Sequence, residues 1–328
     1  MDAISSISSD RNFVRIRALG LNQLYAKIEG LNPAGSIKMK TALGMIASLE
    51  ARGDIKSDTV LIESSSGSLG VALSMICAER GYKFTCVVDP NASSQNVKMM
   101  KALGAGIIMV TERDDNGGFL GTRIAHIKKL TAGDARYLWL NQYANPDNPR
   151  AHVRTTARSI FERFERLDYL FIGAGTTGTL MGCVAFFQEH SPHTKIVAVD
   201  SVGSVTFGHS SGARYIPGLG TSRRPEVYAP DGIHAFEMIA EVDTVAMCRY
   251  LAHTNGFLAG GSTGTVLAAV HQWQQKLPPE ATVVAISPDL GERYLDTVYD
   301  DEWVTKCFGY VPDVGAIGNA VAGGLKAA

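Results

Sequence analysis

Two patterns of apolar residues alternate along the chain. Short apolar runs such as Val60-Leu61-Ile62 are typical of strands buried on both faces of a parallel sheet. Longer segments between these runs have apolar residues every three or four positions, the spacing of helices with one buried face. We predict strands at 13–16, 24–28, 60–63, 84–88, 107–110, 137–140, 169–172, 195–199 and 282–286. We predict helices at about 38–53, 71–80, through 97 to 104, 119–130, 152–166, from the loop at 173–179 to about 189, 243–254 and 265–276.

This alternation of strands and helices predicts an α/β fold whose mostly parallel sheets are covered by helices on both faces, so that each domain has three layers. Two such series lie on either side of about residue 142, and we expect two α/β domains with a ligand site in the cleft between them. The Gly- and Pro-rich segment 203–232 is predicted to be irregular, and the Gly/Ala-rich tail 309–328 to be peripheral.

Charge and composition do not alter the predicted fold, but they argue against several classes of function. The 328 residues include 31 basic and 32 acidic ones, so nothing indicates a nucleic-acid partner. The uncharged stretch 170–187 is interrupted by glycines, which favours strand, loop and helix over a membrane span. His190 and His193 lack a neighbouring cluster of cysteines or carboxylates, so no metal site is predicted. Five scattered cysteines without a CxxC spacing, and no signal-peptide pattern, predict a reduced, cytoplasmic protein.

One lysine stands where a structural cation is poorly placed. In the stretch 32–38, Pro33 and Gly35 end the preceding element, and Ser36 can cap the helix that follows. Lys38 then falls in the first helical turn, where the helix dipole disfavours a positive charge. This position suits a lysine that loses its charge by forming an imine with a carbonyl cofactor. The alternative is an exposed surface lysine.

Two further loops join a predicted strand to a predicted helix. The glycines and threonines of 173–179 provide backbone N–H groups and hydroxyls at a helix N-terminus, which can bind a phosphate. Their spacing does not fit the dinucleotide pattern G-x-G-x-x-G, and a plain tight turn is the alternative. The serines of 64–70 suit a carboxylate in the same way, or serve only as helix caps. The turn 259–264 does not indicate a particular function by itself.

Taken together, these loops resemble the cysteine synthase family, enzymes of fold type II that use pyridoxal 5′-phosphate (PLP). The resemblance covers roughly residues 10–305. It implies that Asn32 to Lys38 is the family's NPxGSxK, with Lys38 as the Schiff-base and catalytic lysine. Further cofactor-binding residues implied are Ser68, Gly175, Thr176, Thr177, Gly178, Thr179 and Ser262, the last facing the pyridine nitrogen. Substrate-binding residues implied are Ser65, Ser66, Gly67 and Gln142, for the substrate carboxylate.

The resemblance also implies a division of the chain. Residues 13–34 and 142–308 are expected to form a larger domain that binds the PLP phosphate, and residues 35–141 a smaller, mobile domain with the substrate-carboxylate loop. A homodimer is implied as well. The chain departs from the family pattern at Ser68, where the family has an asparagine that bonds the cofactor's 3′-oxygen. It departs again at Lys38-Met39-Lys40, where the family has KDR, and at 155–159, where TTGPE is usual.

The remaining sequence is similar to one branch of the family, the N-(2-amino-2-carboxyethyl)-L-glutamate synthases of 2,3-diaminopropionate biosynthesis. The matching stretches are 86–90, 122–125, 141–145, 196–208 and 296–303. This similarity implies β-replacement that joins O-phospho-L-serine to L-glutamate, releases phosphate, and serves siderophore or peptide-antibiotic pathways. Lys38, with a pKa lowered by burial, would remove the α-proton. Small-molecule amino acids are then the partners.

A leaving phosphate and a dicarboxylate nucleophile both require cations. Arg123 borders the apolar face of its predicted helix, so it either extends its charge to solvent or points into the cleft; its place in a matching stretch favours the cleft. Tyr143 could donate a hydrogen bond beside it or lie in the core. Arg223 and Arg224 could gate the entrance or form a solvated pair, and Lys40 is a further phosphate candidate.

Three other functions remain as alternatives. A cysteine synthase would combine O-acetylserine or O-phosphoserine with sulfide. A serine or threonine deaminase would release the eliminated product to water. A catalytically impaired paralogue would bind PLP without turnover because of Ser68.

Overall fold

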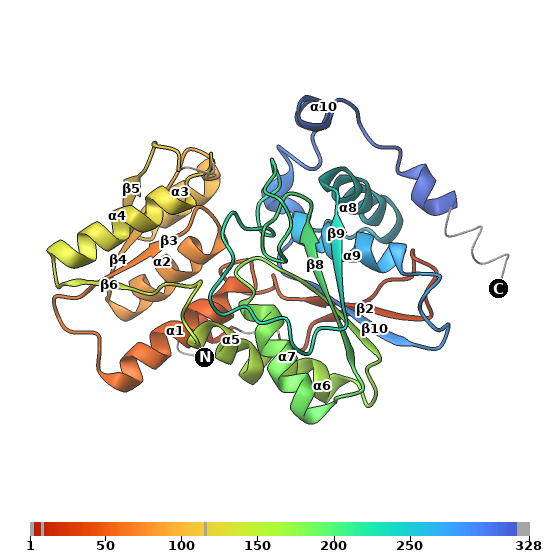
Figure 1. Cartoon of the computed structure of the whole chain (residues 1–328), viewed down its shortest axis with the longest axis horizontal. Coiled ribbons are helices and arrows are strands. Elements are labelled where there is room, and N and C mark those ends of the chain that lie inside the picture. The colour runs from red at the N-terminus through yellow and green to blue at the C-terminus, as the bar shows by residue number, and fades with distance from the viewer. Residues whose placement is uncertain (1–2, 8–9, 115–116, 320–328) are drawn as a thin grey trace.

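The strands are divided between two sheets, which lie in two lobes of the computed structural model (Figure 1). The structure describes residues 3–7, 10–114 and 117–319. The larger sheet has the order β1-β2-β10-β7-β8-β9, and β1 alone among these described strands runs antiparallel to its neighbour. The bounds are β1 Phe13–Arg15, β2 Gln23–Ile28, β7 Tyr169–Gly173, β8 Lys195–Ser201, β9 Ala235–Ile239 and β10 Thr282–Ser287.

The smaller sheet is parallel throughout and has the order β5-β4-β3-β6. Its strands are β3 Val60–Ser64, β4 Lys83–Val88, β5 Gly106–Met109 and β6 Tyr137–Trp139. These findings confirm the predicted α/β class with mostly parallel sheets. The boundaries proposed for the two domains stay a prediction.

Helices cover both faces of each sheet, as Figure 1 shows for the larger one. In β7, Phe171 packs with α8 (Glu241–Asn255) and α9 (Gly261–Gln272), while Leu170 and Ile172 face the opposite core beside α7 (Gly178–His190). This alternation follows from the two-residue period of a strand. The smaller sheet packs against α1 (Lys38–Arg52) and α2 (Ser68–Arg80) on one face and α4 (Leu120–Gly133) on the other.

Other elements connect these layers. They are η1 Ile4–Ser6, α3 Ser94–Ala102, α5 Asp147–His152, the π-helical turn η2 Val153–Ala157, α6 Arg158–Arg163, the 3₁₀ turn η3 Gly291–Tyr294 and α10 Asp301–Phe308. No described helix is long and apolar enough to cross a lipid bilayer. The uncharged stretch 170–187 is strand β7, a loop and most of α7, as predicted.

The structure corrects several predicted boundaries. The helix predicted at 152–166 begins at Asp147, widens into the π-helical turn, and ends at Arg163. Pro149 is compatible with this earlier start because it lies in the first turn, where its missing N–H has no intrahelical partner. Helix α9 begins at Gly261 rather than 265. Strand β9 and helix α10 were missed; β9 follows the irregular segment and pairs with β8 alone at the sheet edge.

The tail predicted to be peripheral lies partly outside the described residues, which end at 319. Within it, Ile317 is buried against the core that α8 and α9 form with the larger sheet. Four of the five cysteines are buried and Cys307 is partly buried, and all are free thiols. They are small core residues, as the sequence indicated.

Candidate functional site

Lys38 is the first residue of α1, and its side chain is half-buried. Its Nζ lies 3.5 Å from Thr176 Oγ1, in the loop before α7. Burial lowers the pKa of Lys38 to about 8. Among the described residues, no carboxylate lies within salt-bridge distance of this amine. The amine of Lys38 therefore loses its proton more readily than that of an ordinary lysine, and imine formation requires this neutral form.

The turn before Lys38 is fixed to the end of β10. Ile37 N donates to Pro288 O at 2.7 Å, and Ser36 forms an isolated bridge with Asp289. Ser36 was predicted as the helix cap, but the N-cap residue is Ile37, which makes no side-chain cap. Ser36 Oγ still accepts a hydrogen bond from Lys38 N at 3.3 Å, so it satisfies a free N–H of the first turn.

The loop after β7 has the features of an anion site. Helix α7 follows it with thirteen residues, so unsatisfied N–H groups and the positive end of the dipole meet there. Thr177 adopts a left-handed backbone with φ 61°, and its buried Oγ1 has no hydrogen-bond partner among the described residues. A side chain at Gly178 would overlap Asn148 Oδ1. This oxygen is also buried, and none of the described residues donates a hydrogen bond to it. The geometry suits a phosphate.

Asn148 joins this loop to the serine loop 64–70 through Gln142. Its Nδ2 donates to Thr176 Oγ1 at 3.2 Å and to Gln142 O at 2.9 Å. Gln142 Nε2 in turn donates to Ser64 O at 3.0 Å, at the end of β3. The two loops predicted from the sequence, together with Lys38 and Gln142, therefore meet in one place. Asn148 itself was missed, although it follows Gln142 by six residues in the segment that carries it.

The serine loop leads directly into α2. Ser65 Oγ accepts a hydrogen bond from Gly70 N at 3.0 Å, which closes the loop over the first turn of the helix. Ser66 and Gly67 are half-buried. Ser68, predicted to lie in the loop, is the first residue of α2, and Arg293 Nη1 donates to its Oγ at 3.4 Å. The helix N-terminus and the hydroxyls suit a carboxylate.

Ser262 lies in the first turn of α9 and is buried. The segment 217–220 covers it so closely that a side chain at Gly218 would overlap Ser262 Oγ. A side chain at Gly175 would meet Gly218 O at 2.8 Å, and Gly220 N donates to Ala174 O at 3.0 Å. Ser262 and the phosphate-type loop are thus adjacent, separated by one turn of the segment predicted to be irregular.

Arg123 is buried in α4, and its Nε forms an ion pair with Asp89 Oδ2 at 3.2 Å. Its Nε and Nη1 are buried without hydrogen-bond partners among the described residues. Tyr143 lies near it: burial raises the pKa of this phenol, and the charge of Arg123 opposes that shift. The charges of Arg223 and Arg214 act on Tyr143 in the same direction. The charge of Glu63 acts in the opposite direction and raises the pKa of Tyr143.

Glu63 was missed by the sequence analysis. It ends the otherwise apolar run of β3, and its fully buried carboxyl group accepts hydrogen bonds from Ser64 N at 2.7 Å, Gln142 N at 3.1 Å and Trp139 Nε1 at 3.3 Å. Burial raises its pKa to about 7. The sequence feature that could have identified Glu63 is a single acidic residue at the end of a buried strand. The Glu63 carboxylate holds the Gln142 segment against the serine loop.

The other cations singled out from the sequence have partners of their own. Lys40 Nζ lies 2.7 Å from Glu29 Oε2 and 2.6 Å from Asp10 Oδ1, so carboxylates bind the charge that was a candidate for phosphate. Arg223 forms an ion pair with Glu226. Arg224 is exposed, and its guanidinium lies 4.9 Å from the centre of the Tyr228 ring.

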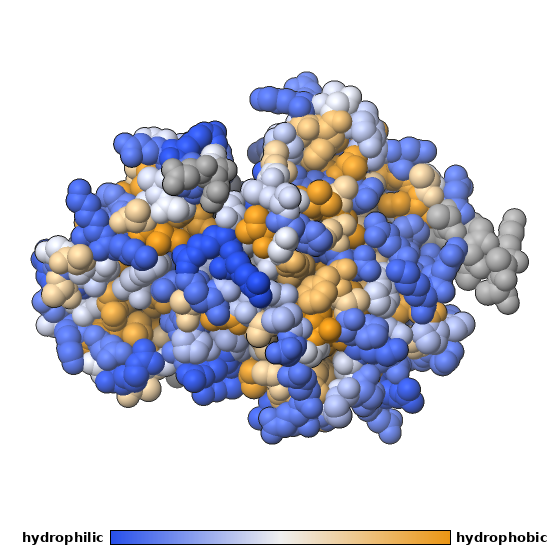
Figure 2. All heavy atoms as spheres, viewed as in Figure 1, coloured by the Kyte–Doolittle hydropathy of each residue, from blue (hydrophilic) through white to orange (hydrophobic). Residues whose placement is uncertain are grey.

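These residues fit the cofactor that the resemblance implies. An amine with a lowered pKa lies next to a phosphate-type loop with unpartnered buried polar atoms, and Ser262 lies beside that loop. The space-filling view in Figure 2 shows the surface hollowed between the two lobes. Strand carboxyl ends and their loops are where α/β proteins bind ligands.

Comparisons with known proteins agree with this geometry. The family of pyridoxal-phosphate dependent enzymes matches residues 11–289. The N-(2-amino-2-carboxyethyl)-L-glutamate synthase of Ralstonia nicotianae is 41% identical over 285 residues, 87% of this chain and 84% of that protein. The crystal structure of an O-ureido-L-serine synthase superposes with a TM-score of 0.84 at 29% identity, covering 93% of this chain and 99% of the other.

An O-acetylserine dependent cystathionine β-synthase from Helicobacter pylori gives the same TM-score of 0.84 at 28% identity, over 90% of this chain and 98% of its own. The expected PLP dependence and the resemblance to the cysteine synthase group are thereby confirmed. The chain belongs to the family of pyridoxal-phosphate dependent enzymes, and it is an enzyme that uses this cofactor.

Proposed function

We propose that this enzyme joins O-phospho-L-serine to L-glutamate, giving N-(2-amino-2-carboxyethyl)-L-glutamate and phosphate. The observation that carries the proposal is Arg123: a buried guanidinium that keeps an unpartnered Nη1 beside its ion pair with Asp89, and whose charge acts on Tyr143. Such a guanidinium suits substrates that bring a phosphate and a second carboxylate. The relative from Ralstonia nicotianae, named for this product, supports the choice.

Lys38 would hold the cofactor, with residues 175–179 around its phosphate and Ser262 at its ring nitrogen. When bound, PLP withdraws electrons from the α-carbon of the amino acid and so stabilises negative charge there. Because the Ser262 hydroxyl is neutral, it would leave the ring nitrogen without a proton. Ser68 is shorter than an asparagine and receives a hydrogen bond from Arg293, which fixes its hydroxyl in place.

Once released from the cofactor, the Lys38 amine would remove the α-proton of the substrate. A base works best when its pKa lies near the working pH, and burial brings the pKa of Lys38 to about 8. The Thr176 hydroxyl, 3.5 Å from Nζ, orients the amine. The substrate carboxylate would bind at the N-terminus of α2, to Ser65, Ser66 and Gly67, with the remaining amide hydrogen of Gln142.

In the proposed reaction, the α-proton would pass to Lys38 and its bonding electrons would form a second bond between the α- and β-carbons. The bond between the β-carbon and the phosphate oxygen would break at the same time, and phosphate would leave with the bonding electrons. The glutamate nitrogen would then form a bond to the β-carbon and give a proton to the released phosphate, while the α-carbon takes a proton back from Lys38. Arg123 and Tyr143 would bind the leaving phosphate or the glutamate side chain.

The product is a precursor of 2,3-diaminopropionate, and we place the enzyme in the cytoplasm, as a homodimer, in the formation of a siderophore or peptide natural product. These assignments follow the branch resemblance. The second candidate is a cysteine synthase, favoured by the likeness to the O-acetylserine dependent enzyme.

Visible absorption of the holoenzyme distinguishes these functions. The enzyme is mixed with O-phospho-L-serine and then with either L-glutamate or sulfide. We expect the cofactor band to change with the first substrate and to be restored by glutamate but not by sulfide. Restoration by sulfide alone would make the enzyme a cysteine synthase. A bound cofactor whose band does not respond to any of these amino acids would identify an impaired paralogue.

A further inference from the structure

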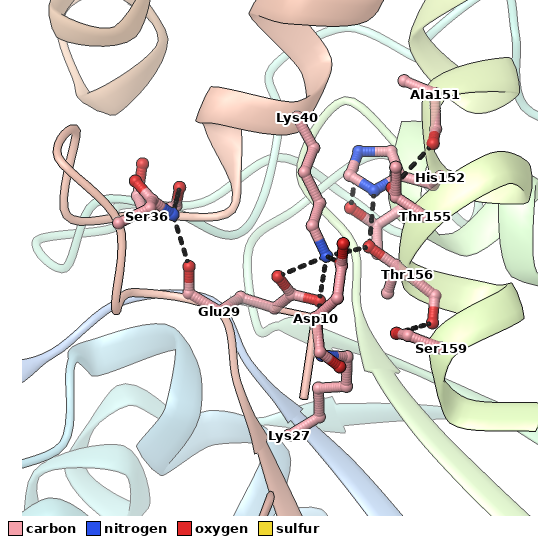
Figure 3. A network of polar contacts seen from close by, with 12 residues as sticks. Asp10, Lys27, Glu29, Ser36, Lys40, Ala151, His152, Thr155, Thr156 and Ser159 are labelled. Carbon is pink, nitrogen blue, oxygen red and sulfur yellow. Dashed lines mark hydrogen bonds and ion pairs between the residues drawn. The ribbon is translucent and has the colours of Figure 1, made fainter. Parts of the chain in front are cut away.

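A chain of polar side chains connects Lys40 to the loop that we assign to the cofactor phosphate, and Figure 3 shows its buried part from Lys40 to His152. Lys40 Nζ donates to Thr156 Oγ1 at 3.4 Å, and Thr156 Oγ1 lies 3.1 Å from His152 Nδ1. His152 Nε2 lies 3.3 Å from Thr179 Oγ1, in the first turn of α7. We call Lys40, Thr156, His152 and Thr179 the His152 relay.

The charged end of the relay is fixed inside the protein. The Lys40 ammonium is held by Glu29 at 2.7 Å and Asp10 at 2.6 Å, and Figure 3 shows these carboxylates around its Nζ. Lys40, Thr156 and His152 are all buried. An ammonium can only donate hydrogen bonds, so Thr156 Oγ1 must be the acceptor in its contact with Lys40.

The direction of the next bond follows from what Thr156 can do with its own proton. Its neighbour Thr155 donates to Ala151 O at 2.7 Å, the usual habit of a threonine in a helix. Thr156 has no such carbonyl acceptor among the described residues. Its hydroxyl proton is therefore donated to His152 Nδ1, the other polar atom within hydrogen-bond distance. The positive charge of Lys40 also favours a lone pair, rather than a proton, on Nδ1, the ring nitrogen on its side.

His152 is a neutral imidazole, because burial and the charges of Lys40 and Lys38 hold its pKa well below the usual value. A neutral ring whose Nδ1 accepts carries its proton on Nε2. This proton points between Thr41 Oγ1 at 3.0 Å and Thr179 Oγ1 at 3.3 Å. When Thr179 accepts it, the Thr179 hydroxyl proton is left to donate elsewhere, at the N-terminus of α7.

We propose that His152 is a positioning residue: Lys40 and Thr156 fix its Nε2–H tautomer, and this tautomer turns the Thr179 hydroxyl into a donor for an anion bound at the start of α7. The relay thus supplies a directed hydrogen bond without placing a charge in the site. The inference rests on the proposed function only in taking that anion to be the cofactor phosphate.

The tautomer is measurable in the unmodified holoenzyme. In protein labelled with ¹⁵N-histidine, the His152 signals are identified by their loss in His152→Gln. We expect a one-bond N–H coupling at Nε2 and none at Nδ1. A proton on Nδ1 would overturn the proposal, whatever reaction the enzyme catalyses.

A pair of matched variants tests the consequence for the anion. Thr156→Val breaks the relay, and Thr155→Val removes the neighbouring hydroxyl that lies outside it. We expect Thr156→Val to weaken binding of PLP to the apoprotein by about threefold to tenfold, the range of one hydrogen bond, and to leave binding of pyridoxal, which lacks the phosphate, unchanged. Thr155→Val is expected to change neither.

A double-mutant cycle with Thr179→Val completes the test. If the relay acts through Thr179, the double variant Thr156→Val/Thr179→Val binds PLP no worse than Thr179→Val alone. Losses that multiply, or equal losses for pyridoxal and PLP, would overturn the proposal. Failure of the proposed function would look different: the relay would behave as expected while glutamate failed to react.

Discussion

Burial of the Lys38 side chain changes the acid–base behaviour of the residue that we place at the centre of the reaction. A free lysine side chain keeps its proton until about pH 10.5, whereas burial lowers the pKa of Lys38 to about 8. Since the lowered pKa favours the neutral form, the neutral fraction reaches one half at about pH 8 and becomes nearly complete well above this pH. Among the described side chains, only Thr176 accepts a hydrogen bond from Nζ.

The pH dependence of cofactor attachment follows from this shift. Only the neutral amine reacts with the aldehyde of PLP, so the rate at which the apoprotein binds PLP covalently is expected to rise with pH and to level off above about 8. Stopped-flow absorption between pH 6.5 and 10.5 measures the rate. A rate that still rises steeply above pH 9.5 would show an ordinary lysine, and Lys38→Ala should give no covalent attachment.

Removal of the Arg123 charge tests the assignment of substrate binding. We expect Arg123→Met to lower kcat/KM for L-glutamate or O-phospho-L-serine by about tenfold or more, the value of a hydrogen bond to a charged group. Arg224→Met, at an exposed arginine, is the matched control and should have little effect. Because Arg123→Met leaves Asp89 unpaired, the double variant with Asp89→Asn separates lost stability from lost binding. Unchanged kinetics in the double variant would contradict the assignment.

At this scale, the sequence could identify residues whose signal is local. Lys38 and the glycines and threonines of 175–179 stand in short patterns with a chemical meaning of their own. Glu63, Asn148 and His152 could not be found in this way, because each acts on a residue that is distant along the chain. Asn148, for example, matters through Thr176, which lies 28 residues away.

Among the elements, the start of α7 depends on the absence of a side chain at Gly178. An added methyl group there would overlap Asn148 Oδ1, and Asn148 is held by bonds to Gln142 O and Thr176 Oγ1. Overpacking of this kind costs about 1–3 kcal/mol, and it would displace the loop that we assign to the phosphate.

Two alanine substitutions compare this position with an open one. Gly178→Ala is expected to lower the unfolding free energy by about 1–3 kcal/mol and to weaken PLP binding. Gly133→Ala, at the end of α4 where an added methyl group meets nothing within 4 Å, should raise the unfolding free energy by about 0.4–1 kcal/mol. Denaturant unfolding and PLP titration measure both. If Gly178→Ala changed neither the unfolding free energy nor PLP binding, Asn148 would have to move away from the added methyl group without cost.

Most elements were predictable because apolar periodicity is strong in buried strands and in the helices that cover them. The errors have physical causes. Strand β9 needs only one partner and carries Glu237 in its centre, so its pattern is weak. The π-helical turn after His152 widens a helix that periodicity alone extends without a break. The first turns of α2 and α9 are rich in serine, threonine and glycine, residues that are typical of loops.

For the whole molecule, Arg293 links the two lobes at the site. It belongs to η3, beyond the larger sheet; its Nη2 donates to Ala34 O at 2.7 Å and its Nη1 to Ser68 Oγ at 3.4 Å. Gly35, with φ 65°, allows this approach, because a side chain there would meet the guanidinium. One side chain therefore holds the turn before Lys38 and the start of α2 together.

Loss of this link should loosen the smaller lobe locally. We expect Arg293→Met to lower the unfolding free energy by about 1–3 kcal/mol and to speed amide hydrogen exchange in residues 65–71, with no change in the buried strand β7. Arg158→Met is the control, since its ion pair with Glu162 is exposed and contributes about 0–0.5 kcal/mol. Equal exchange in the two variants would show that Arg293 is not a link.

The two-sheet architecture was predictable from the sequence, whereas the contact between the lobes was not. Strand and helix alternate regularly enough to predict parallel sheets, and two series implied two units. The pairing of β10 with β2 joins residues more than 250 positions apart, and no local pattern encodes it. The same holds for Arg293 and Ser68.

The identity of the nucleophile is the central claim, and direct product analysis tests it. The holoenzyme is given O-phospho-L-serine with equal concentrations of ¹⁵N-labelled L-glutamate and sulfide, and the products are identified by mass spectrometry while phosphate is measured. We predict labelled N-(2-amino-2-carboxyethyl)-L-glutamate in step with phosphate release. Cysteine as the product, without the labelled compound, would contradict the proposed function and leave a cysteine synthase built on the same site.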